Sequence, residues 1–222
     1  MKIGSESRKN YSKDIGVRYG KRLDSFPKRI GITGSPATGK RSVGENLARV
    51  LGLEFLSIND YAIHLGYGKW KAKDFLVDIK RLRGAIKTEN RIVSGHLLPY
   101  VVPDRDLDLI LILRCSPMVL RKRYESRGYS EDKIRENIEA EAIGIIAEKC
   151  IHEYDSAKIA ELDMSRIKNP MTAVIKILDI IIGKKRMSFG AIDWLSSART
   201  PSDLERVLRG KYHTLNKTKK DN

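Results

Sequence analysis

The stretch Gly34-Ser35-Pro36-Ala37-Thr38-Gly39-Lys40-Arg41-Ser42 decides the fold of this chain. It has the spacing GxxxxGK, and it lies between a short apolar run, Ile30 to Thr33, and a segment of helical periodicity, Lys40 to Leu51. The glycines allow a tight loop whose amides point inward at an anion, and the helix N-terminus adds partial positive charge. We therefore expect the nine residues to bind ATP, with Lys40 reaching the β- and γ-phosphates. An ordinary glycine-rich turn with an exposed lysine is the alternative.

The residue after the lysine departs from the usual loop. That position normally holds Ser or Thr, whose hydroxyl binds magnesium, but here it is Arg41, and a hydroxyl follows at Ser42. We expect no direct ligation of Mg²⁺ by the loop, and we expect Ser42 to hydrogen-bond a phosphate. Arg41 either adds its charge to the phosphate or faces solvent, because arginine suits both roles.

Outward from the loop, short apolar runs alternate with stretches of 3.6-residue period. This alternation predicts an α/β fold built on a parallel sheet. The predicted strands are 30–33, 53–58, 92–95, 107–113 and 160–162; the predicted helices are 40–51, 70–86, 116–128, a long helix from 130 through Ile146, and 171–182.

The composition is that of a folded intracellular protein. Hydrophobic residues make up 41% of the 222, which excludes disorder throughout. Two cysteines, Cys115 and Cys150, cannot form a disulfide framework, and a reduced, buried state is expected for both. No apolar run approaches 18 residues and no signal peptide is evident, so we expect no membrane contact and a cytoplasmic location, or a nuclear one in a eukaryote.

The positive charge lies mainly in the flanks. The formal net charge is +15, of which residues 1–29 and 183–222 each hold +6. We predict three parts: a basic N-terminal arm without a core role (1–29), a nucleotide-binding domain (30–182) and a basic C-terminal extension (183–222). Such segments either bind the phosphate backbone of RNA or serve only as solubilising tails.

Several strings resemble, in order, the small adenylate kinases of archaea and eukaryotic nuclei. The family includes the coilin-interacting nuclear ATPase and also acts in assembly of the small ribosomal subunit. The likeness spans residues 30–182, and its most specific string is Arg127-Gly-Tyr-Ser-Glu-Asp-Lys-Ile-Arg-Glu-Asn-Ile-Glu-Ala-Glu141. The other strings are the phosphate loop, 52–60, Ser94-Gly95-His96 and 111–114.

The resemblance implies a P-loop NTPase fold of the nucleoside monophosphate kinase type. Its five-stranded parallel sheet would be flanked by helices, with a monophosphate region at about 57–80 and a lid at about 126–136. Arg127 matches the position of the family's lid arginine, so the resemblance implies that it binds ATP and acts in catalysis with Lys40. For Arg121 and Arg123, a solvated helix face is the favoured interpretation.

Two further residues gain roles from the resemblance. His96 matches the histidine linked to ATP hydrolysis, and a structural histidine is the alternative. Asp60 would orient the monophosphate region or the attacking group, against an ordinary helix N-cap. Tyr67 and Trp70 are left as packing or surface residues.

Three departures from the family pattern bear on the chemistry. Ser94 stands where the family usually has an aspartate, so Mg²⁺ is expected to arrive with ATP rather than on an evident protein carboxylate. Ala37 replaces a loop glycine, which is tolerable only if the position needs no positive φ. The string Lys69-Trp70-Lys71-Ala72-Lys73 makes a normally acidic region basic, which weakens the case for AMP as acceptor.

Two functions fit these observations best; a third, a kinase for a small molecule other than a nucleotide, would keep the loop but leave the lid string unexplained. The first is a kinase that converts ATP and a nucleoside monophosphate, AMP foremost, into two diphosphates, with slow ATPase activity. The second is a nucleotide-binding assembly factor with little or no turnover, whose basic arms hold ribosomal RNA or a ribosomal protein.

Overall fold

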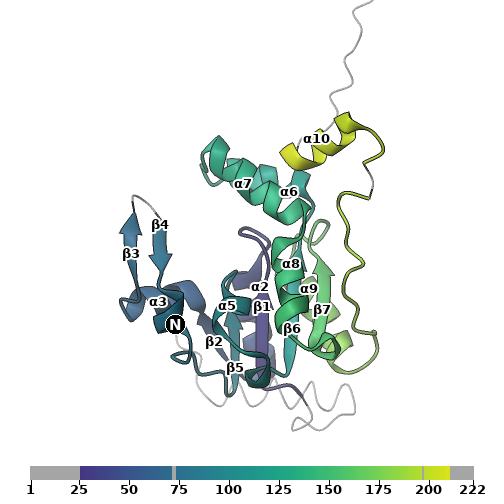
Figure 1. Ribbon diagram of the computed structural model, residues 1–222. Helices are drawn as coiled ribbons and strands as arrows, with labels where there is room; N and C mark the ends of the chain where they lie inside the picture. Colours follow the sequence, from purple (N-terminus) through teal and green to yellow (C-terminus); the bar gives the residue numbers. More distant parts are fainter. Residues whose placement is uncertain (1–25, 72–73, 197, 211–222) are drawn as a thin grey trace, which may run out of the picture.

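A five-stranded parallel sheet forms the centre of the molecule. The computed structural model describes residues 26–71, 74–196 and 198–210. The strand order is β2-β5-β1-β6-β7, and every neighbouring pair is parallel (Figure 1). The α/β fold with five parallel strands is therefore confirmed. The strands are β1 (Arg29–Thr33), β2 (Glu54–Ser57), β5 (Arg91–Ser94), β6 (Leu109–Arg114) and β7 (Ile159–Asp163).

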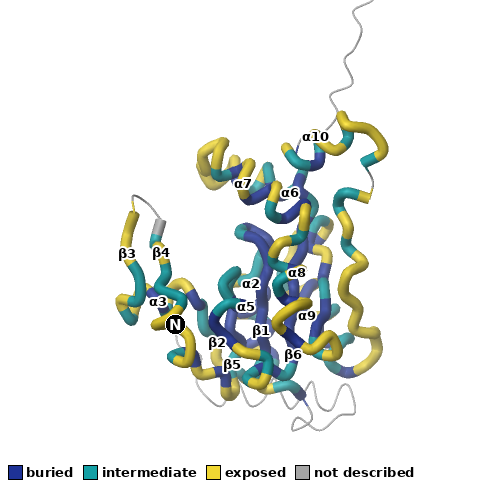
Figure 2. The backbone as a smooth tube through the Cα atoms, viewed as in Figure 1, coloured by how far each residue is buried: buried dark blue, intermediate teal, exposed yellow. Residues whose placement is uncertain are grey.

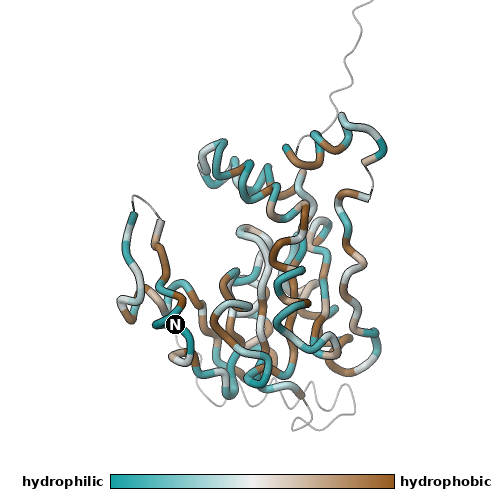
Figure 3. The backbone as a smooth tube through the Cα atoms, in the orientation of Figure 1, coloured by the Kyte–Doolittle hydropathy of each residue, from teal (hydrophilic) through white to brown (hydrophobic). Residues whose placement is uncertain are grey.

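Helices cover both faces of the sheet. Every residue of β6 is buried, and successive residues alternate between two core clusters: Leu111 lies in one and Ile112 in the other (Figure 2). This burial explains the continuous apolar run. Brown, hydrophobic segments gather in the centre of the molecule in Figure 3. The first cluster includes residues of α2 (Lys40–Leu51), α6 (Pro117–Glu125), α7 (Glu131–Ala142) and α9 (Pro170–Ile181); the second includes residues of α3 (Ile58–His64), α4 (Ile79–Leu82), α5 (Leu98–Val101) and α8 (Ile145–Glu153).

The predicted helix over 70–86 is wrong. Antiparallel strands β3 (Gly68–Lys71) and β4 (Asp74–Val77) form a separate two-stranded sheet that stands apart in Figure 1. Only the four-residue helix α4 follows, capped by the Asp78 side chain. Period-2 and period-3.6 patterns overlap in a short apolar run, and here the cross-strand pair Trp70–Phe75 decides for strands.

The predicted long helix from residue 130 is divided. Helix α7 stops at Ala142 and α8 begins at Ile145, because Gly144 adopts a left-handed conformation with φ 72°. A left-handed residue cannot continue a right-handed helix, and glycine takes that conformation without strain. The break lets α7 lie over the phosphate loop while α8 packs on the sheet.

The ends of the described chain contact the core. Phe26 is buried, so the expectation that residues 1–29 have no core role is wrong at position 26, although residues 1–25 lie outside the described residues. After α9 the chain returns along β7, where the Glu161 amide donates to Ser188 O at 2.9 Å. Helix α10 (Pro201–Arg209) then packs on α6 and α7. The domain boundaries at 29 and 182 stay predictions.

Other expectations concern thiols and membranes. Both cysteines are buried and free. No helix in the described ranges is long and apolar enough to cross a bilayer.

Candidate active site

The phosphate loop joins β1 to α2 as expected. Gly39 caps α2 in a left-handed conformation, and Gly34 has φ 134°. A Cβ added at Gly34 would lie 2.2 Å from the carbonyl oxygen of Leu113, so no larger residue fits there. The two glycines therefore have the roles that the motif predicts. Gly34 lets the chain pass close to the neighbouring strand, and Gly39 lets α2 begin with its N-terminus toward the loop.

Ala37 contradicts the condition that its position needs no positive φ. Its φ is 60°, although it carries a side chain. A left-handed conformation costs an L residue about 1–2 kcal/mol, because Cβ crowds the following carbonyl. The loop holds this strain with its own hydrogen bonds, including one from Thr38 Oγ1 to Ser35 O at 2.9 Å.

Lys40 reaches back into the loop. Its Nζ donates to Ser35 O at 2.8 Å. Burial lowers the pKa of Lys40 to about 8; the nearby charge of Arg127 also lowers it, while Glu141 opposes the shift. A half-buried ammonium whose charge is only partly compensated favours an incoming anion. The loop is therefore a cationic site suited to phosphate.

Helix α6 supports the loop from the other side. Tyr124 OH donates to Pro36 O at 2.8 Å, and Arg123 Nη1 donates to Ala37 O at 2.9 Å. Arg121 is largely buried and pairs with Glu131 at 2.6 Å. Arg121 Nη1 also donates to Arg209 O at 2.9 Å. The interpretation of Arg121 and Arg123 as a solvated helix face is therefore wrong, because both side chains contact groups that lie more than 80 residues away in the sequence.

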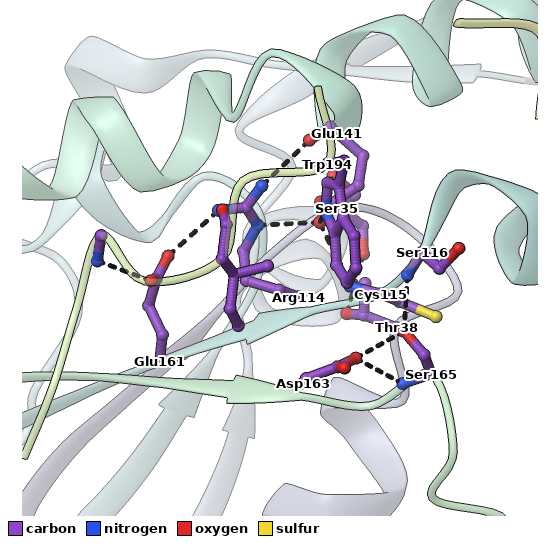
Figure 4. Close-up of polar contacts among 12 residues, drawn as sticks. Ser35, Thr38, Arg114, Cys115, Ser116, Glu141, Glu161, Asp163, Ser165 and Trp194 are labelled. Carbon is purple, nitrogen blue, oxygen red and sulfur yellow. Dashed lines mark hydrogen bonds and ion pairs between the residues drawn. The ribbon is translucent and has the colours of Figure 1, made fainter. Parts of the chain in front are cut away.

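Glu141 of α7 joins the loop to two other parts of the chain, at Arg114 and Trp194 (Figure 4). Its carboxylate accepts from Ser35 Oγ at 2.6 Å, from Arg114 Nε at 2.8 Å and from Trp194 Nε1 at 3.1 Å. Arg114 also pairs with Glu161 at 3.0 Å, and the side chains of Arg114, Glu141 and Glu161 are at most 5% exposed. Because a buried ion pair is costly unless its remaining hydrogen bonds are made, this network fixes the loop in one position.

Ser94 and His96 lie where β5 ends, beside the phosphate loop. Ser94 is buried and in register with Ile32 of β1. Burial, followed by the charges of Lys40 and Lys133, lowers the pKa of His96 to about 4. His96 is therefore neutral near pH 7, and the shift places it within the electrostatic reach of Lys40. This position is compatible with both of its predicted roles.

Arg41 and Asp60 form an ion pair, which sequence analysis did not predict. Both side chains are more than half exposed, and Arg41 Nη2 also lies 3.4 Å from Ser57 Oγ. The N-cap of α3 is Ser57, so the N-cap alternative for Asp60 is wrong; Asp60 instead donates its amide to the cap. The pair links the phosphate-loop helix to the start of the predicted monophosphate region.

Arg127 lies in the turn between α6 and α7. Its amide donates to Tyr124 O at 3.0 Å, and the residue is exposed. Its charge contributes to the lowered pKa of Lys40, so it is near the phosphate pocket. Ser42 lies in the first turn of α2 and is exposed.

Several residues in or next to the loop network were not identified as site residues from the sequence. They are Arg114, Arg123, Tyr124, Asn137, Glu141 and Trp194. Three of them lie in strings of the family resemblance, which were the available signals: Asn137 and Glu141 in the most specific string and Arg114 at the end of 111–114. Arg123, Tyr124 and Trp194 lie in no such string, and each contacts a residue at least 53 positions away.

Comparisons with known families agree with this geometry. A family model described as an AAA domain matches residues 30–144, just over half of the chain. A Thermococcus kodakarensis protein named "Putative adenylate kinase" is 32% identical over 169 residues, covering 74% of this chain and 92% of that protein. A Methanococcus maripaludis protein of the same name is 34% identical over 177 residues, covering 75% and 94%.

Solved structures offer a more distant likeness. A shikimate kinase from Bacteroides thetaiotaomicron aligns with 71% of this chain and 99% of its own, at 18% identity and a TM-score of 0.47.

Proposed function

The chain belongs to the family of archaeal putative adenylate kinases, and we propose that it transfers the γ-phosphate of ATP to a nucleoside monophosphate, AMP foremost. The observation that carries the proposal is the half-buried Lys40, whose Nζ donates to the carbonyl of Ser35 in the phosphate loop. Phosphoryl transfer requires little covalent chemistry from the protein, so positioned cations and backbone amides supply most of the catalysis. Lys40 and Arg127 are the catalytic cations in this proposal, and residues 34–42 with Arg127 hold ATP.

Magnesium would enter with ATP. Within the described ranges no three His, Cys, Asp or Glu side chains gather into a metal site, and Arg41 occupies the position at which such loops usually offer a hydroxyl. The donor set therefore fits a cation held by phosphate and water oxygens rather than a resident metal. When bound, Mg²⁺ neutralises charge that develops between the phosphates.

The acceptor would lie toward α3 and the β3–β4 pair. The Arg41–Asp60 ion pair connects this region to α2, and Asp60 is the residue we propose to position the monophosphate. The exposed Lys69 and Lys71 make the region basic. A basic region suits a phosphate-bearing acceptor without selecting its base.

We also propose slow hydrolysis of ATP, with His96 as the group that orients water. Neutral imidazole can accept a hydrogen bond from water, and the pKa of His96 keeps it neutral at physiological pH. Hydrolysis would be slow because Ser94 brings no charge to organise magnesium-bound water.

A phosphotransfer assay tests the proposal. ATP and Mg²⁺ are supplied with a panel of nucleoside monophosphates, and nucleoside diphosphate and free phosphate are measured in parallel. Lys40→Ala should lose ATP binding and turnover, and Arg127→Ala should lose turnover while its unfolding free energy stays near the parent's. Lys87→Ala is the matched control, because Lys87 precedes β5 and so lies at the opposite end of the parallel strands from the phosphate loop. ATP affinity that survives Lys40→Ala in a folded protein contradicts the site.

The second candidate is a nucleotide-binding assembly factor with reduced turnover, and the net charge of +15 favours it. Ribosomal RNA or a ribosomal protein would bind through the basic arms, most of which lie outside the described residues. RNA binding that weakens steeply with salt and disappears on removal of both arms supports this role. We also propose a cytoplasmic location for the protein.

A further inference from the structure

Helix α7 carries a polar stripe over the phosphate loop. Lys133, Asn137 and Glu141 are spaced by four residues, so they lie on one face of the helix. Glu141 at one end accepts a hydrogen bond from the loop residue Ser35. Lys133 at the other end is close enough to His96 for its charge to act on the imidazole. Asn137 lies between these two residues on the same face of the helix.

Asn137 is a buried polar side chain without a complete set of partners. It is 9% exposed, and its Nδ2 donor has no hydrogen-bond partner among the described residues. An unpaired buried donor is costly, so an amide at this position needs a compensating contact. The apolar neighbours on the helix, Ile134 and Ile138, contribute to the core instead.

We propose that the side-chain amide of Asn137 donates to a phosphate oxygen of the bound nucleotide. The inference rests on the proposed function, because it takes ATP as the ligand of the loop. It adds a residue of helix α7 to the residues that we propose to bind phosphate. The acceptor is a phosphate rather than the base, because Glu141 at one end of the stripe accepts a hydrogen bond from the phosphate loop and Lys133 at the other end lies within electrostatic reach of His96.

The charge of the stripe agrees with this assignment. Glu141 is occupied by Arg114, Trp194 and Ser35, so its carboxylate is neutralised away from the ligand. Lys133 brings a positive charge, with Glu136 at 3.0 Å from its Nζ. Asn137 adds a neutral donor that can approach a phosphate without the cost of burying another charge. Lys133, Asn137 and Glu141 would thus lie over the nucleotide and together bring little net charge to it.

Two variants separate a phosphate contact from a structural role. Asn137→Leu keeps the branching and the number of heavy atoms and removes the polar atoms, and Asn137→Asp keeps the shape but replaces the donor with a charged acceptor. Glu139→Gln, an exposed change on the same helix, is the control. The probes are ATP and inorganic tripolyphosphate, each measured by calorimetry on the full chain, together with thermal unfolding without ligand.

The expected result is a loss of affinity without a loss of folding. Asn137→Leu should weaken ATP and tripolyphosphate about tenfold or more, as for a lost hydrogen bond to a charged group, while its ligand-free melting temperature stays equal or rises. Asn137→Asp should weaken both further, because a carboxylate repels phosphate. Glu139→Gln should match the parent.

Other outcomes overturn the inference. A fall in melting temperature with unchanged affinity for both probes makes Asn137 structural, and a loss confined to ATP with tripolyphosphate unaffected places the contact on the base or ribose. If the parent itself binds neither probe, the proposed function fails as well, so the two failures are distinguishable.

Discussion

Trp194 and Glu141, 53 residues apart, are joined by a hydrogen bond of 3.1 Å from the indole Nε1 to the carboxylate Oε1. The same carboxylate accepts from Ser35 of the phosphate loop at 2.6 Å. Trp194, which follows the segment that returns along β7, therefore joins the hydrogen-bond network that holds the phosphate loop (Figure 4). A change far from the loop in sequence should act on the loop through one carboxylate.

Trp194→Phe should reduce both stability and ATP affinity. The phenyl ring retains most of the apolar contact but cannot donate to Glu141, and loss of a hydrogen bond to a charged group costs about 1.5–3 kcal/mol. Urea unfolding and ATP calorimetry measure the two effects. Trp70→Phe is the matched control, since Trp70 is 63% exposed. Equal losses in both variants would show that the indole hydrogen bond is unimportant.

ATP affinity should fall above pH 8. The pKa of Lys40 is about 8 in the ligand-free protein, and phosphate charges favour the protonated form. Binding at higher pH must first protonate Lys40, so affinity should drop by up to about tenfold between pH 8 and 9. Lys40→Arg, which stays charged throughout, should show a flat profile over this range. A parent profile as flat as that of Lys40→Arg contradicts the lowered pKa.

Acid should destabilise the fold through His96. Its pKa is about 4 in the folded chain and ordinarily about 6.5, so the unfolded chain binds the proton first as pH falls. Its contribution is complete above pH 6.5 and is lost as pH falls to 4, by about 3 kcal/mol. The slope of unfolding free energy against pH should be shallower in His96→Gln. The exposed His152 offers the control substitution His152→Gln, which should keep the parent's slope.

Ala37→Gly should stabilise the protein slightly. Glycine relieves the left-handed strain at φ 60°, about 1–2 kcal/mol, and costs about 0.4–1 kcal/mol of extra freedom in the unfolded chain. A net gain of up to about 1 kcal/mol is expected in thermal or urea unfolding. Ala48→Gly, inside helix α2, should lose stability instead. A loss at both positions would mean that the loop does not store strain at Ala37.

Local sequence was sufficient where the structure depends on neighbouring residues. The glycine spacing of 34–42, the apolar runs of the strands and the caps at Ser130 and Asn169 all act within a few positions, so the loop and the parallel sheet were predictable. The same local signals misled at 70–86, where a helical and an alternating pattern coincide, and cross-strand pairing decided between them.

Tertiary structure alone decided how the site is held. Ser35 meets Glu141 over 106 residues and Tyr124 meets Pro36 over 88, and no periodicity encodes such pairs. Charged residues in a sequence look alike whether they face water or a buried partner, so the partners of Arg114 and Arg123 could not be predicted. Their roles arise because folding removes water from these groups, and each buried charge or donor must then find a partner from a distant part of the chain.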